Sequence, residues 1–164
     1  MEESARIADQ LRRAFEGGAW HGPALYELLS NVPAEQAVLR PIPGAHSIWE
    51  IVLHVAAWEE VALKRVAGRS VKLTDAEDWP PVEDESEGAW QEALGDLRSG
   101  HIRLRQAIEQ LSELDLEEPV RGRDYPIYNL LHGVIQHDLY HAGQIAMLKK
   151  AEVEAGSPST AGKP

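Results

Sequence analysis

The sequence predicts an all-α fold, a four-helix bundle with long crossover connections. Four stretches carry apolar residues at helical spacing, no stretch alternates convincingly with the two-residue period of a strand, and two connections are too long for tight hairpins. A chain of 164 residues, 43% of them hydrophobic, suffices for one well-packed domain but not for two ordinary ones. We expect a single domain over residues 1–155 and a disordered tail over residues 156–164.

The first helix is expected near the N-terminus, where apolar residues recur at helical spacing from Ile7 to Phe15. It should end at Gly17 and Gly18, because glycine has a low helix propensity. Pro23 can occupy the first turn of a short second helix. The three prolines of the following stretch, NVPAEQAVLRPIPGAH, then predict a loop-rich connection.

The second long helix should begin at the stretch SIWE, which has the form of a capping box. In this motif the hydroxyl of Ser47 and the carboxylate of Glu50 would each accept a hydrogen bond from a backbone N–H of the first turn. The helix should run to Gly68 with an amphipathic pattern, and Glu59 and Arg65 should lie largely off its apolar face.

Two further long helices are expected in the second half of the chain. The acidic, proline-containing stretch TDAEDWPPVEDESEG separates the second long helix from a third, whose apolar face runs from Trp90 to Leu111. Pro126 can occupy the first position of a fourth helix that extends to about Lys150. The long acidic connection permits a crossover between neighbouring helices.

The composition narrows the classes of function. A formal net charge of −11 repels phosphate backbones and anionic lipid headgroups, so neither nucleic acid nor a membrane is an expected partner. No apolar run approaches the roughly 20 residues that span a bilayer, and the charged N-terminus lacks a signal peptide's apolar core, so we expect a soluble, cytoplasmic protein. The absence of cysteine excludes disulfides and thiolate ligands, and any metal must therefore be held by His, Asp, Glu or water.

Two histidines, His137 and His141, lie four residues apart within the apolar stripe of the fourth expected helix. Imidazoles at this spacing can reach one divalent ion, but two core-edge histidines bonded to neighbouring polar groups would show the same spacing. His54, at the edge of the apolar face of the second long helix, can supply a third nitrogen. Three histidines from two helices predict an open metal site, which leaves coordination positions for water or substrate.

Other polar residues are candidates for supporting roles. Gln144 and Asp138 lie near the two edges of the stripe, where either could accept the second ring N–H of a ligand histidine. His101 shares the apolar face of the third helix and could either approach the site or be a core histidine bonded to another helix. His132 falls on the opposite side of the fourth helix and should face solvent, while His46 lies in an expected turn. No residue is assigned as a catalytic acid or base.

The segments SIWEIVLHVAAWEE and HDLYHAGQIAML, with the early AFEGGAWHGPALYELL, resemble the DinB/YfiT-like superfamily of bacterial four-helix-bundle proteins over nearly the whole chain. The resemblance implies an up-down-down-up bundle, often dimeric, that holds a divalent ion such as Zn²⁺, Ni²⁺ or Fe²⁺ on three histidines. By matching motifs these are His54, His137 and His141. Characterised relatives include S-transferases that use the thiol cofactors bacillithiol or mycothiol and a mycothiol-dependent maleylpyruvate isomerase, and many members are known only as stress-induced or DNA-damage-induced proteins.

Two hypotheses of function follow. The first is a metal-dependent enzyme of thiol S-transferase or hydrolase type, in which the ion activates a water or a low-molecular-weight thiol such as bacillithiol or mycothiol toward a small-molecule substrate. The second is a non-catalytic, stress-related binding or dimerisation module with a structural or vestigial metal site. A homodimer is expected in either case.

Overall fold

The computed structural model describes residues 2–156, with side chains as far as residue 151. Every regular element in this range is a helix, which confirms the all-α prediction. The long helices are α1 (Glu3–Phe15), α4 (Ile48–Val66), α6 (Glu87–Glu109) and α8 (Ile127–Gly156), and the short ones are α2 (Leu25–Leu29), α3 (Ala34–Ala37), α5 (Asp75–Asp78) and α7 (Glu113–Glu117). The expected disordered tail, apart from Gly156, lies outside the described residues.

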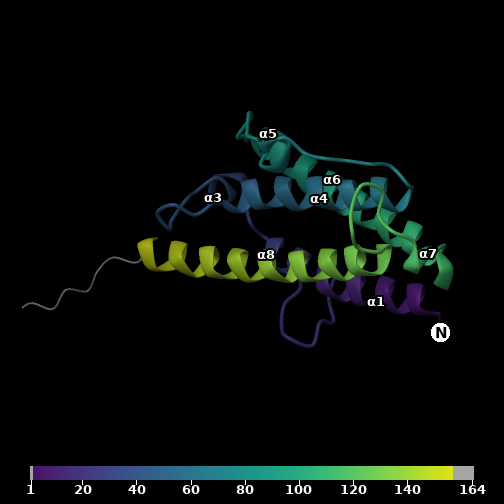
Figure 1. The fold of residues 1–164 in the computed structure, drawn as a ribbon. Coiled ribbons are helices and arrows are strands. Elements are labelled where there is room, and N and C mark those ends of the chain that lie inside the picture. The colour runs from purple at the N-terminus through teal and green to yellow at the C-terminus, as the bar shows by residue number, and fades with distance from the viewer. Residues whose placement is uncertain (1, 157–164) are drawn as a thin grey trace, which may run out of the picture.

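The long helices pack side by side into a bundle (Figure 1). Helix α4 packs against α6 and α8, and α1 packs against the same two helices. The first half of the predicted loop-rich connection contains α3, and the acidic connection between α4 and α6 contains α5. Both connections are therefore partly helical.

The helix ends follow local signals. The Ser47 hydroxyl accepts the Glu50 N–H at 3.1 Å, and a Glu50 carboxylate oxygen accepts the Ser47 N–H at 2.8 Å, which confirms the predicted start of α4. The helix ends before Gly68, whose φ of 75° lies in the left-handed region that side chains with a Cβ rarely adopt. Ser86 caps α6 by accepting the Ala89 N–H at 3.2 Å.

The core consists of two clusters of buried apolar side chains. The first apolar cluster gathers around Val55 of α4, Leu97 of α6 and Ala142 of α8. The second apolar cluster includes Ala62, Leu104 and Val134 of the same three helices, and it lies later in α4 and α6 but earlier in α8. On each helix a polar residue falls between the two clusters: these residues are Glu59, His101 and Asp138, and all three are buried.

Two charged residues of α4 correct the sequence prediction. Glu59 and Arg65 were expected off the apolar face, but their exposed fractions are only 1% and 4%. The reason is that each finds polar partners supplied by distant parts of the chain, which an amphipathic pattern within one helix does not reveal. The prediction that His132 faces solvent is also wrong, because its ring is half-buried beside the Tyr128 ring one turn earlier, with the centroids 4.4 Å apart.

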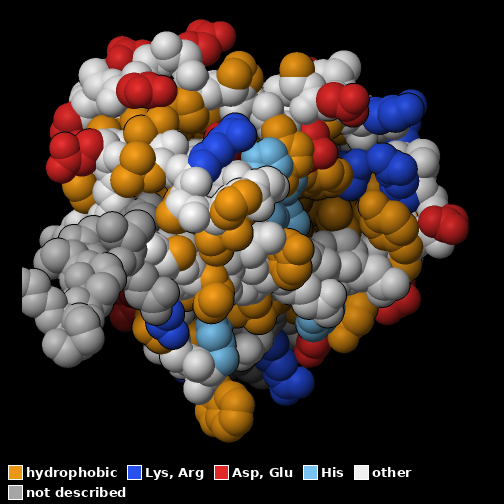
Figure 2. All heavy atoms as spheres, turned by 90° about the vertical axis from the view of Figure 1, so that its left-hand side faces the viewer, with side chains coloured by type: hydrophobic (Ala, Val, Ile, Leu, Met, Phe, Trp, Pro, Cys, Tyr) orange, Lys and Arg blue, Asp and Glu red, His pale blue; other side chains and the backbone are white. Residues whose placement is uncertain are grey.

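The kinds of side chain on the surface differ from one region of the molecule to another. Viewed from the end shown in Figure 2, histidine side chains reach the surface among hydrophobic ones, and acidic side chains gather nearer the edge of the face. Among the described residues, no helix combines the length and apolarity that crossing a bilayer requires.

Candidate metal centre

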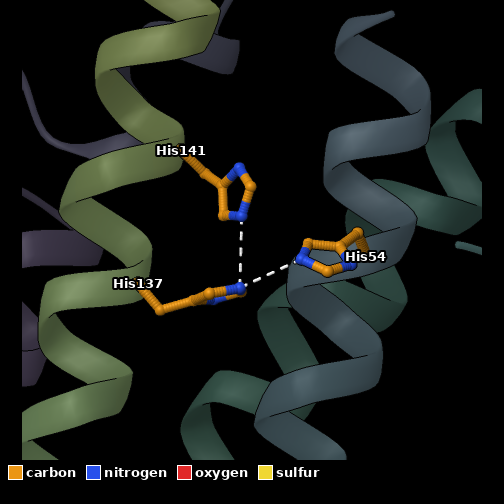
Figure 3. A group of neighbouring side chains, drawn as sticks. All are labelled: His54, His137 and His141. Atoms are coloured by element: carbon orange, nitrogen blue, oxygen red, sulfur yellow. Dashed lines mark hydrogen bonds between the residues drawn. The ribbon is translucent and has the colours of Figure 1, made fainter. Parts of the chain in front are cut away.

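Three histidines from two helices point toward one another (Figure 3): His54 from α4, and His137 and His141 from α8. The Nε2 atom of His137 lies 3.0 Å from Nε2 of His54 and 3.1 Å from Nε2 of His141. His54 and His141 are buried, and His137 is half-buried. The structure thus brings together the three histidines singled out in the sequence, each offering the same ring atom to a common point.

The short helix α5 holds the His54 ring in place. The Nδ1–H of His54 donates to the backbone carbonyl of Asp78 at 2.6 Å, and the Trp79 ring stacks on the imidazole with centroids 3.8 Å apart. Trp79 also stacks on His46, with centroids 3.6 Å apart, so the indole lies between two imidazoles. Because Nδ1 carries the proton, Nε2 of His54 presents a lone pair.

Sequence reasoning missed these supporting residues, because the segment was interpreted as an acidic linker. A signal was nevertheless present in the stretch TDAE, which forms a capping box at the start of α5. Asp78 has a second role, since one of its carboxylate oxygens accepts the indole N–H of Trp58 at 2.6 Å. Helix α5 therefore positions both a candidate ligand and its aromatic neighbour.

Gln144 holds the ring of His141 in the corresponding way. The Nδ1–H of His141 donates to the side-chain oxygen of Gln144 at 2.7 Å. The remaining nitrogen, Nε2, therefore presents a lone pair toward His137. This contact is the one expected of a residue that orients a ligand histidine.

Burial keeps all three imidazoles neutral near pH 7. Burial, together with the neighbouring His141 and His54, lowers the pKa of His137 to about 3, and the pKa of His141 is lowered to about 4, mainly by burial. Burial also lowers the pKa of His54, against the opposing effect of Asp78. Neutral imidazole is the form that binds a metal.

The donor set fits a divalent ion. Neutral His137 carries at most one proton on Nε2, so it can donate to His54 or to His141 but not to both, and one close pair is left with two lone pairs facing each other. An ion shared by the three nitrogens satisfies every lone pair at once. Nitrogen ligands about 2.0–2.1 Å from a tetrahedral ion lie about 3.3 Å apart, close to the observed spacings.

A second group of residues with metal-binding side chains lies in the core. The ligand atoms of Glu59, His101 and Asp138 are within 4.8 Å of one another, and all three residues are buried. The Nδ1–H of His101 donates to a Glu59 oxygen at 2.9 Å, and the His101 ring stacks on Phe15. His101 is thus a core histidine bonded to another helix, the second of the two possibilities left open by the sequence.

Asp138 does not take the supporting role expected of it. Neither of its carboxylate oxygens accepts a hydrogen bond from a histidine, and the side chain lies in the core beside Glu59 and His101. Burial raises the pKa of Glu59 and of Asp138, and the charge of Glu59 raises the latter further. A proton shared between the two carboxyl groups accounts for this pair without an ion.

Comparison with known proteins places the chain in a family. Residues 18–145 match the sequence profile of the DinB superfamily, and the matched segment contains all three histidines of the candidate centre. A search of curated proteins and a search of solved structures each found no match. Because the profile covers most of the chain, the protein belongs to the DinB superfamily.

Proposed function

We propose that the protein is a divalent-metal-dependent enzyme of thiol S-transferase or hydrolase type, with its ion held by His54, His137 and His141. The observation that carries this proposal is the convergence of three Nε2 atoms, two of them fixed as lone-pair donors by hydrogen bonds at Nδ1. Three protein ligands leave coordination positions for water or substrate, which is the pattern of catalytic and not of structural sites.

The protein's own residues supply neutral nitrogen donors and hold them in position. When bound, a divalent ion lowers the pKa of a coordinated water or thiol, so that a nucleophile forms near neutral pH. Since the chain has no cysteine, a reacting thiol must be a small molecule, and bacillithiol or mycothiol is the cofactor that we propose. Zn²⁺, Ni²⁺ and Fe²⁺ all suit a site made of imidazoles.

The wider expectations from the family resemblance belong to the same proposal. They are an up-down-down-up order of the four long helices, assembly into a homodimer, a cytoplasmic location and a link to stress. Size-exclusion chromatography with light scattering tests the dimer directly, because a monomer at micromolar concentration would contradict it.

Metal content tests the centre itself. The parent, His141→Ala and the control His132→Ala should be purified without a nickel column and measured by elemental mass spectrometry. We expect about one ion per chain in the parent and in the control, which loses a histidine of the same helix outside the trio, and little in His141→Ala. Equal metal in the parent and in His141→Ala would refute the three-histidine centre.

Activity is then tested on the metal-loaded protein. The assay pairs bacillithiol, mycothiol or glutathione with a panel of electrophiles, and a separate panel of esters tests hydrolysis. We expect turnover by the parent and none by His141→Ala. If no compound in any panel is turned over, the proposal that the protein is an enzyme of this type is refuted.

A non-catalytic binding or dimerisation module is the second candidate. It is favoured by two exposed apolar side chains on α8, Tyr140 and Met147, whose exposed fractions are 65% and 58%. Both line a surface pocket of about 410 Å³ that also includes His46 and Gln144. Large exposed apolar side chains beside a pocket are typical of a surface that binds a partner.

A further inference from the structure

A pocket of about 410 Å³ lies beside the candidate metal centre. It is walled by α4, α8 and the segment before α8, and its lining includes Trp58, Arg65, Tyr125, Leu130, Val134 and the candidate ligand His137. The volume is in the range of small-molecule sites, and the walls are largely apolar. A molecule in this pocket therefore contacts a ligand of the proposed ion directly.

Arg65 contributes a buried positive charge to the pocket. Its side chain is 4% exposed, and among the residues that the structure describes it forms no ion pair with a carboxylate. Its guanidinium donates to the backbone carbonyl of Val71 at 3.1 Å and to the Tyr125 hydroxyl at 3.3 Å. A guanidinium has five N–H donors, so these neutral acceptors leave donors available and the charge uncompensated.

The surroundings of Arg65 disfavour its charge and do not compensate it. Burial lowers its pKa, against the opposing effect of Tyr125, and the nearby positive charge of Arg123 also lowers it, but a guanidinium still stays protonated at neutral pH. Buried arginines are normally paired with an anion, because an isolated charge is costly in a medium of low polarity. In a chain of net charge −11, an unpaired buried guanidinium is a local site for an anion.

Trp58 connects this charge to the metal centre. Its ring centroid lies 5.7 Å from the Arg65 guanidinium carbon and 6.1 Å from the centroid of the His137 ring. The indole is fixed by its hydrogen bond to Asp78, the residue that also holds His54. A small molecule that lies on this ring can therefore touch both the guanidinium and the centre.

We propose that the pocket binds a small molecule with a carboxylate on the Arg65 guanidinium and an apolar body against Leu130 and Val134. Its reactive group then lies at His137, and this last part rests on the proposed function. The carboxylate accepts two hydrogen bonds from the planar guanidinium, a geometry that a neutral amide cannot reproduce. The substrate class is thus an apolar monocarboxylate with its reactive group distant from the acid.

The test compares 4-phenylbutanoate with its neutral amide, 4-phenylbutanamide, by isothermal titration calorimetry. We expect the parent to bind the carboxylate at least about tenfold more tightly than the amide, corresponding to about 1.4 kcal/mol. Arg65→Met should remove this preference, and Arg65→Lys should retain part of it. The matched control Arg103→Met removes one positive charge from an exposed side chain and should leave the preference unchanged.

Two measurements separate this site from the metal itself. Each titration is repeated after the metal has been removed with a chelator. If the carboxylate of the ligand bound the ion and not Arg65, the ligand would bind more weakly once the ion is removed. Metal content and helical circular dichroism of Arg65→Met should equal those of the parent, which shows that the fold and centre are intact. Equal affinity of the parent for acid and amide, or loss of acid binding on chelation, would overturn the anion site while leaving the metal centre standing.

Discussion

His101 should make the protein less stable in acid, and the replacement His101→Gln should remove that contribution. The imidazole is fully buried, stacked on Phe15 and bonded to Glu59, and burial lowers its pKa from 6.5 to about 4. Glutamine keeps an N–H donor for Glu59 but cannot take up a proton. The comparison therefore isolates protonation from hydrogen bonding.

The magnitude follows from linkage between protonation and folding. The unfolded chain takes up a proton on this histidine below pH 6.5, whereas the folded chain resists it down to about pH 4, so the stabilisation is complete above pH 6.5 and is lost as the pH falls. The 1.5 pH units between 6.5 and 5 correspond to about 2 kcal/mol, at about 1.4 kcal/mol for each unit. The total loss approaches its limit of about 3.4 kcal/mol below pH 4.

The assay is guanidinium unfolding of chelated protein at pH 8 and pH 5, for the parent and for His101→Gln. Other buried histidines destabilise both proteins in acid and cancel in the comparison, so the parent should lose about 2 kcal/mol more than the variant. The matched control His21→Gln alters an exposed histidine and should behave as the parent does. Equal losses in the parent and in His101→Gln would refute the argument, because they would mean that folding does not lower the pKa of His101. A smaller loss in the parent would refute it as well, because it would mean that Glu59 stabilises the protonated imidazole.

Two further outcomes concern the centre. Gln144→Ala should weaken metal affinity by about 10-fold to 100-fold, because the His141 ring loses the acceptor that orients it; competition with a coloured chelator measures this, and unchanged affinity would show that Gln144 is dispensable. Chelation of the parent should lower the melting temperature by at most about 10 °C and leave the helical circular dichroism intact, since the bundle has its own apolar core. Unfolding on chelation would instead indicate a structural ion.

Structural features could be predicted from the sequence where the interacting residues lie close together along the chain. The capping box at Ser47 and Glu50 involves residues three apart, and the spacing of His137 and His141 places both on one side of α8. The position of His54 at the edge of an apolar face was enough to suggest that it turns inward. Local periodicity thus located the fold class and the three histidines.

Prediction failed where the partner comes from a distant segment. Glu59 can be buried because it accepts a hydrogen bond from His101, which lies 42 positions later in the chain. Arg65 can be buried partly because it donates to the hydroxyl of Tyr125, which lies 60 positions later. Asp78 and Trp79 contact His54 only because the chain after α4 folds back over that helix. Such contacts depend on the tertiary fold, and the rule that charged residues face solvent gives the wrong answer for them.

The buried polar residues between the two apolar clusters have a consequence for how the helices align. If α8 slid by one turn, about 5.4 Å, Asp138 would move to the level now occupied by Val134 or Ala142, both of which belong to apolar clusters. Its carboxyl group would then lose Glu59 and lie among hydrocarbon side chains, an arrangement that is strongly unfavourable. The same slip would separate His137 and His141 from His54. The buried polar residues Glu59, His101 and Asp138 thereby favour the alignment of α8 that assembles the three histidines over an alignment one turn away.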